Sequence, residues 1–230
     1  DPQHPDLFEY IRVAQESFPT REAYKPSNIS SYITYEEAFE RLLAFADRLK
    51  PYCLVSTTGD QSPDSRQARL AVLLNNCPAY LNCFWSAAAL RAIVTALNNR
   101  YVDVYTQSEI WENPPRKQFM DTIAKSALES EMLVCVNAQV AGKEIEELLL
   151  GCPCEVLVVG VEFSDVVGSL HLPSLGIKSV VWVGEWTFSP DEQLRAEEGM
   201  HAEGVENLCY NKVSTPTPET SLFEPPPMPK

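Results

Sequence analysis

Short runs of apolar, largely β-branched residues recur along this chain, and segments with helical spacing lie between them. Continuous apolar runs of this kind are typical of strands whose two faces are both buried, as in a parallel sheet covered by helices. The sequence therefore predicts an α/β fold with a doubly wound, mainly parallel sheet and helices on both faces. The predicted strands are Leu70–Leu74, Ile93–Leu97, Met132–Val136, Glu155–Gly160 and Lys178–Gly184.

The clearest helix begins after Thr34. The Thr34 hydroxyl and the Glu37 carboxylate have the spacing of a capping box, in which each accepts a hydrogen bond from the other residue's amide. Residues 50–67 are rich in polar residues and turn formers, which predicts a loop. The predicted helices are Leu7–Phe18, Tyr35–Leu49, Pro78–Leu90, Lys143–Leu150 and Ser164–Leu170, with short extended pieces at Glu22–Lys25 and Tyr32–Ile33.

These patterns divide the chain into two parts. Residues 1–185 are expected to form one α/β segment, within which residues 101–130 are a candidate insertion or an artefact of the gene model. Residues 186–230 are first acidic without an apolar period and then Pro-rich, which predicts a poorly ordered tail. The sequence thus places a domain boundary near residue 186.

The net charge and the cysteines restrict the classes of binding partner and the cellular compartment that are expected for this chain. The net charge is −14 and no run of Lys and Arg occurs, which argues against nucleic acid and anionic membranes as partners. No apolar stretch reaches the length of about 20 residues that spans a bilayer, and the first residues do not resemble a signal peptide. The 7 cysteines, mostly within apolar runs, indicate reduced thiols in an intracellular, cytoplasmic protein. A peroxisomal location stays open for a longer form, although Met228-Pro229-Lys230 is not a peroxisomal signal.

Nucleotide-binding loops are not found in the sequence. A dinucleotide site needs Gly-x-Gly-x-x-Gly between a strand and a helix, and none of the predicted strand ends carries those glycines. Gly142-Lys143-Glu144 lacks the hydroxyl residue of a phosphate-binding loop. Thr57-Thr58-Gly59 lacks the lysine and precedes the first predicted sheet strand.

Other candidate reactive groups have simpler interpretations. Cys152-Pro153-Cys154 has one residue too few for a thioredoxin-type redox pair, and a zinc site would need Cys135, Cys209 or His171 from distant segments. We interpret these cysteines as structural. The remaining candidates are interpreted as solvated side chains: His4, His171 and His201, and the acidic cluster Glu144, Glu146 and Glu147.

Five segments in a fixed order resemble the adenylate-forming superfamily, which contains acyl-CoA synthetases, luciferases and adenylation domains. The resemblance extends over roughly residues 7–185, as the N-terminal portion of such an enzyme. In that family a glycine usually follows the helix that here ends at Leu90, and Arg91 and Ala92 stand in its place. Two segments, Leu133–Ala138 and Ile93–Leu97, both resemble the same strand of the family. The segments are Phe18-Pro19 with Tyr32–Glu37, Arg69–Tyr80, Phe84–Arg100, Glu144–Val159 and Lys178–Glu185.

The resemblance implies an enzyme that converts a carboxylic acid, such as a fatty acid, and ATP to acyl-AMP and then to acyl-CoA, with Mg²⁺ as cofactor. In the family, the phosphate-binding loop, the magnesium-binding Glu and the catalytic Lys all follow the segment matched here. The sequence up to Lys230 contains none of them, so we expect a fragment without adenylation activity. No catalytic, cofactor-binding or metal-binding residue is assigned, and the alternatives are a noncatalytic interaction module or an unrelated doubly wound domain.

Overall fold

Six parallel strands form the central sheet of the computed structural model, which describes residues 7–25, 32–53, 68–98, 134–137, 142–184, 189–217 and 223. In space the strands follow the order β5-β4-β3-β6-β7-β8, and every neighbouring pair is parallel. The predicted doubly wound α/β fold is therefore confirmed. The strands are β3 (Arg69–Leu73), β4 (Ile93–Asn98), β5 (Val134–Asn137), β6 (Val156–Gly160), β7 (Ser179–Val183) and β8 (Glu206–Cys209).

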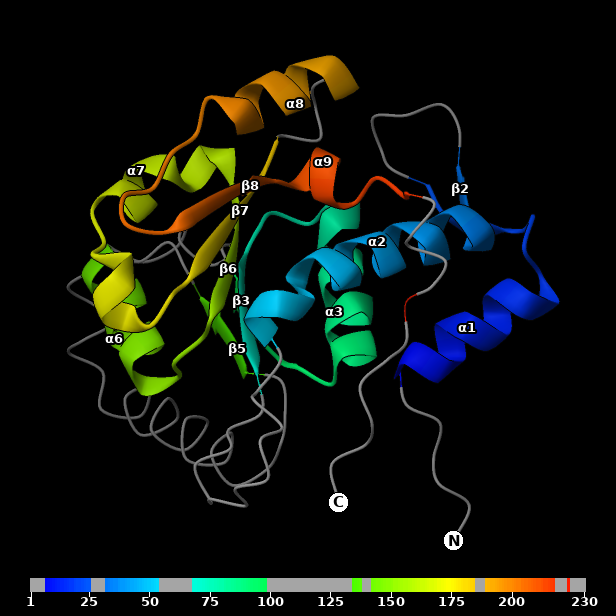
Figure 1. Cartoon of the computed structure of the whole chain (residues 1–230), viewed down its shortest axis with the longest axis horizontal. Coiled ribbons are helices and arrows are strands. Elements are labelled where there is room, and N and C mark those ends of the chain that lie inside the picture. The colour runs from blue at the N-terminus through cyan, green and yellow to red at the C-terminus, as the bar shows by residue number, and fades with distance from the viewer. Residues whose placement is uncertain are drawn as a thin grey trace, which may run out of the picture.

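Helices cover both faces of this sheet (Figure 1). One face carries α1 (Leu7–Ser17), α2 (Tyr35–Cys53), α3 (Pro78–Leu90) and α9 (Tyr210–Val213), and the other carries α6 (Gly142–Gly151) and α7 (Ser164–Gly168). Between the strands and helices lie two short 3-10 turns, η1 (Val161–Phe163) and η2 (Leu172–Leu175).

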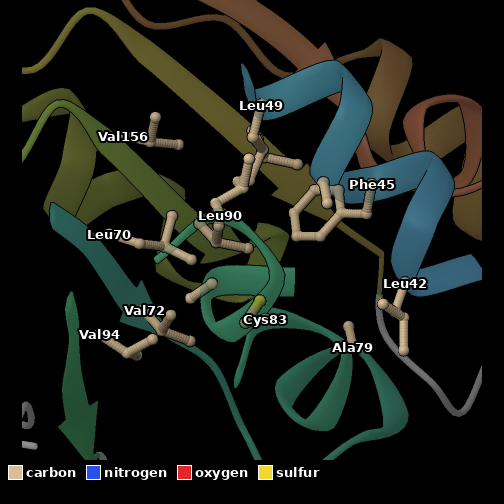
Figure 2. Close-up of a cluster of buried hydrophobic side chains, with 14 of the residues drawn as sticks. Leu42, Phe45, Leu49, Leu70, Val72, Ala79, Cys83, Leu90, Val94 and Val156 are labelled. Carbon is tan, nitrogen blue, oxygen red and sulfur yellow. The ribbon is translucent and has the colours of Figure 1, made fainter. Parts of the chain in front are cut away.

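Side chains alternate between two cores along each central strand. On β3, Leu70 and Val72 belong to the core under α2 and α3, which Figure 2 shows, whereas Ala71 and Leu73 belong to the core under α6. All four side chains are at most 1% exposed. Burying a Leu or Val side chain stabilises a fold by roughly 1.5–3 kcal/mol, so strands that contribute to both cores carry much of the stability.

The capping box predicted at Thr34 is present. The Thr34 amide donates to the Glu37 carboxylate at 2.9 Å, and the Glu37 amide donates to the Thr34 hydroxyl at 3.2 Å. Strands β1 (Glu22–Tyr24) and β2 (Ile33–Thr34) pair antiparallel just before this cap. Helix α2 continues to Cys53, so the first residues of the predicted loop 50–67 are helical; Pro51 removes only one backbone donor, in the last turn.

Between residues 189 and 217 the chain is part of the α/β fold and does not form a separate tail. Residues 189–217 contain α8 (Pro190–Glu198), β8 and α9, and β8 pairs with β7 along the register Val180–Asn207 and Val181–Leu208. The predicted boundary near residue 186 and the predicted disorder are therefore wrong for this stretch. Residues 218–222 and 224–230, where the Pro-rich end was predicted, lie outside the described residues.

A partly buried network of hydrogen bonds around Asn207 explains how the polar strand β8 joins the sheet. The Asn207 carboxamide accepts from the Trp182 indole N–H at 2.9 Å and from the Ala202 amide at 2.8 Å. Its NH₂ group donates to the carbonyls of Ala202 and Val205, at 2.9 and 3.0 Å. Asn207 thus fixes the turn before β8 and ties it to β7, so side-chain hydrogen bonds replace part of the apolar contact that an inner strand would make.

Helix α3 ends without the glycine that the family resemblance leads us to expect. The backbone at the end of the helix is nevertheless left-handed. Arg91 has φ 58° and ψ 30°, and the Ala92 amide donates back to the Ala87 carbonyl at 2.8 Å. A side chain with a Cβ is strained in this region, by about 1–2 kcal/mol. The chain therefore retains the turn and places an unfavourable residue in it.

Replacing Arg91 tests this strain. We expect Arg91→Gly to be more stable than Arg91→Ala by about 1 kcal/mol, because both remove the same side chain and only glycine relieves the left-handed backbone. Urea unfolding of the full chain measures the difference. Equal stability of the two variants would contradict a strained C-cap.

Candidate functional site

The strand order defines where a ligand is expected to bind. The connections run outward from β3 to β5 on one side and from β6 to β8 on the other, so the direction of winding changes between β3 and β6. In open α/β sheets ligands bind at the carboxyl ends of the strands, at this switch point. We call residues 74–77, which follow β3, and residues 160–163, which end β6 and form η1, the switch-point edge.

Asn75 and Glu162 meet across the switch-point edge. The Asn75 amide NH₂ donates to Glu162 Oε1 at 2.5 Å, and both residues are exposed. The Glu162 carboxylate folds back over Gly160, where a Cβ atom would overlap it. The Glu162 carboxylate thus occupies the space that a side chain at position 160 would need.

The chemistry of the switch-point edge does not favour an anion. Residues 74–77 and 160–163 contain no Lys or Arg, and the polar pair described there presents a carboxylate and an amide. A phosphate group placed beside Glu162 would be repelled, because like charges at close range disfavour binding. The edge is better suited to a hydrogen-bond donor or to a neutral part of a ligand.

A second polar cluster lies further along the same end of the sheet, around Glu197. This side chain is 1% exposed. Its Oε1 accepts from the amide of Gly184 at 2.9 Å and from the Asn211 NH₂ group at 3.1 Å, and its Oε2 accepts from the Asn211 amide at 2.9 Å. One carboxylate thus joins the end of β7, helix α8 and helix α9.

Close packing supports the same junction. A Cβ at Gly184 would meet the backbone of Gln193 at 2.7 Å, so α8 rests directly on the chain that leaves β7. Burial raises the pKa of Glu197 to about 7, and the hydrogen bonds from Gly184 and Asn211 oppose that rise. The cluster is inside the protein and joins elements, which is a structural role.

The raised pKa predicts a pH dependence of stability. Because the folded state holds a proton on Glu197 that the unfolded state releases from about pH 4.5, the contribution of this group to stability falls as pH rises from 4.5 to about 7. Over this range, Glu197→Gln should gain stability relative to the wild type by up to about 3 kcal/mol. Urea unfolding at several pH values measures this difference.

Glu198→Gln is the matched control, since Glu198 is the exposed neighbour on α8 and pairs with Lys212 at 2.7 Å. We expect this control to follow the pH dependence of the wild type. Parallel pH curves for Glu197→Gln and the wild type would show that Glu197 does not titrate in this range.

The structure brings together two of the cysteines considered from the sequence. Cys152 and Cys154, which follow α6, lie beside Thr95 of β4 and Arg69 of β3, near the amino ends of the strands. Cys209 lies in β8, and the side chain of Cys135 is outside the described residues. Across the described part of the chain, no three His, Cys, Asp or Glu side chains are grouped so that they could hold a metal ion.

The other candidates stay apart from one another. His171 precedes η2 and His201 lies near Asn207, while His4 and the side chain of Glu144 fall outside the described residues. Glu147 is exposed on α6, in agreement with a solvated face. Sequence reasoning missed Arg69 and Thr95 because they lie at the start of or within apolar strand patterns that give no chemical signal. It missed Glu197 because that residue lies in the acidic stretch predicted to be a poorly ordered tail.

Solved structures with the same arrangement identify the fold. A putative long-chain-fatty-acid CoA ligase from Rhodopseudomonas palustris matches 95% of this chain at 18% identity, with a TM-score of 0.54. A luciferase-like enzyme from the mealworm Zophobas morio matches 100% of it at 12% identity, with a TM-score of 0.57. The fold is that of the adenylate-forming enzymes. The A domain of carboxylic acid reductase from Segniliparus rugosus also has this adenylate-forming fold, matching 92% at 12% identity with a TM-score of 0.55.

The match covers only part of the length of each similar protein. This chain spans 38%, 39% and 30% of those three proteins, so the greater part of each has no counterpart in it. No protein-family model and no curated protein matches the sequence. The fold that the sequence resemblance implies is confirmed by these structures.

The two segments that resemble the same family strand, Ile93–Leu97 and Leu133–Ala138, correspond to different strands of the structure. Strand β4 contains Ile93–Leu97, and β5 lies next to it, with Thr95 opposite Val134 and Leu97 opposite Val136. Both therefore belong to the sheet. Residues 101–130, the candidate insertion between them, lie outside the described residues. Among the described helices, none is long and apolar enough to cross a bilayer.

Proposed function

We propose that this chain is the N-terminal scaffold of an AMP-forming ligase that activates a carboxylic acid, and that the segment alone does not adenylate. The observation that carries the proposal is the fold shared with acid-activating enzymes over nearly the whole chain. The A domain of carboxylic acid reductase is described in complex with AMP and a co-purified carboxylic acid. A carboxylic acid is accordingly the proposed substrate class of the longer enzyme.

The proposed lack of activity follows from electrostatics. Forming an acyl-AMP requires positive charges or backbone donors that stabilise the triphosphate as pyrophosphate leaves. The switch-point edge presents the Glu162 carboxylate, and its two segments contain no Lys or Arg. ATP, Mg²⁺ and CoA are therefore proposed as ligands of a longer form, held by residues outside this segment.

Acid-dependent exchange between pyrophosphate and ATP tests this proposal. The full chain, shown to be folded by a cooperative thermal transition, is incubated with ATP, Mg²⁺ and a panel of short, long and aromatic carboxylic acids. We expect no exchange above the background without protein, whereas a complete adenylate-forming ligase run in parallel gives a clear signal. Acid-dependent exchange by this chain would overturn the proposal.

The alternative is a noncatalytic interaction module that uses the exposed face of α1 to bind a separate partner protein. Leu7, Tyr10 and Val13 are 45%, 62% and 46% exposed. The opposite side of α1 is fixed to α2, where the Phe8 and Phe39 rings stack at 5.8 Å. An apolar stripe on a well-anchored helix is a surface that another polypeptide could cover.

Light scattering after size-exclusion chromatography separates the two candidates. A stable monomer that melts cooperatively favours an independent module. Self-association of the wild type that is relieved by Tyr10→Gln and Val13→Gln favours a scaffold whose neighbouring segments normally cover α1. Glu16→Gln, a change from one polar side chain to another on the same helix, is the control and should leave the association state unchanged.

A further inference from the structure

Cys152 lies in a polar cluster at the end of the sheet opposite the switch-point edge. Arg69 Nη1 donates to the Cys152 sulfur at 3.2 Å, and the Thr95 hydroxyl lies 3.2 Å from the same sulfur. Thr95 is 3% exposed and Cys154 is 1% exposed, while Cys152 itself is half-buried. Three separate elements, β3, β4 and the segment after α6, thus converge on one sulfur atom.

The Arg69 guanidinium has an unusual partner. In the described part of the chain no carboxylate forms an ion pair with it, and its Nε is buried without a hydrogen-bond partner. Glu155 is close, but its carboxylate accepts from the Arg69 backbone amide at 2.8 Å. A partly desolvated guanidinium is stabilised far better by a thiolate than by a neutral thiol, because a neutral sulfur is a weak acceptor.

The neighbouring Cys154 thiol further favours the thiolate form of Cys152. The Cys154 thiol donates to the Cys152 carbonyl oxygen at 3.2 Å, which agrees with a protonated Cys154 beside Cys152. A hydrogen bond from Cys154, with further ones from Thr95 and Arg69, holds the pKa of Cys152 well below its usual value despite partial burial. The hydrogen bond to Cys152 and burial raise the pKa of Cys154 in turn. These contacts favour the thiolate form at Cys152 and the protonated thiol at Cys154.

We propose that Cys152 is an oxidation site, in which a thiolate held by Arg69 and Thr95 reacts with hydroperoxides and then forms a disulfide with Cys154. In the first step the thiolate attacks a peroxide oxygen, the S–O bond forms, the O–O bond breaks and hydroxide or alkoxide leaves. In the second step the Cys154 sulfur attacks the sulfenic sulfur, the S–S bond forms, and hydroxide leaves with the Cys154 proton as water. The two thiols are oxidised by two electrons and the peroxide is reduced.

The geometry gives each cysteine its own part in this reaction. The half-buried Cys152 sulfur is accessible to a small oxidant. Cys154 is 1% exposed, so a neighbouring buried group, and not an oxidant in solution, is expected to react with it. Oxidation of Cys152 also removes the negative charge that, together with the hydrogen bond and burial, keeps Cys154 protonated. The disulfide is expected to reopen with a dithiol reductant.

Alkylation rates test the thiolate. The full chain is treated with limiting iodoacetamide at about pH 6, where an ordinary thiol is almost fully protonated, and labelling is quantified by peptide mass spectrometry. Cys209 is the internal control, because it is similarly half-buried and burial raises its pKa. We expect Cys152 to be labelled at least about tenfold faster than Cys209. Equal rates would overturn the proposal without any substitution that could disturb folding.

Variants separate the contributions. Arg69→Met should slow labelling of Cys152 by about tenfold, and Arg69→Lys, which keeps the charge, should restore most of the rate. Thr95→Val, of nearly the same shape, should slow it by a smaller factor. If Arg69→Met labels as fast as Arg69→Lys, the cation does not stabilise the thiolate and the proposal fails.

Peroxide treatment tests the disulfide. After hydrogen peroxide, the wild-type peptide containing both cysteines should be lighter by two hydrogens and should regain them with dithiothreitol. Cys154→Ser should instead yield a sulfenic acid that dimedone traps at Cys152. Stepwise addition of oxygen in the wild type, with no loss of hydrogens, would show that Cys154 does not resolve the oxidised sulfur.

Discussion

The rest of the structure depends on the burial of β3 from both sides. This strand lies in the middle of the sheet, between β4 and β6, and its side chains alternate between the two hydrophobic cores. Strands of this type have no solvent-exposed face, so helices must cover both sides, and the chain winds first one way and then the other. The place where β3 meets β6 becomes the switch point as a direct result.

The two ends of β3 differ in chemistry. At its carboxyl end lies the switch-point edge, where Asn75 and Glu162 form an exposed polar pair that disfavours a phosphate. At its amino end the Arg69 guanidinium donates to the Cys152 sulfur, and no carboxylate among the described residues forms an ion pair with it. The Arg69 guanidinium thus lies at the end of the sheet opposite to that where α/β proteins usually bind nucleotides. This placement agrees with the scaffold role proposed above.

Local signals in the sequence were sufficient for most of the fold. The capping box at Thr34 and Glu37 and the apolar runs of β3, β4, β6 and β7 depend on neighbouring residues, so periodicity and spacing predicted them. Strand β8 was missed because it has little apolar character and joins β7 through the Asn207 side chain. The cluster of Arg69, Thr95 and Cys152 joins positions that are 83 and 57 residues apart, a juxtaposition that only the strand order creates.

The most direct measurement of this arrangement is a set of nuclear Overhauser contacts in a deuterated sample with protonated methyl and amide groups. We expect contacts from β3 to both neighbours, Val72 to the region of Ala96 on one side and to the region of Val158 on the other, each with parallel registers. Contacts from β3 to one neighbour only, or an antiparallel register with β6, would contradict the switch point and with it the adenylate-forming fold.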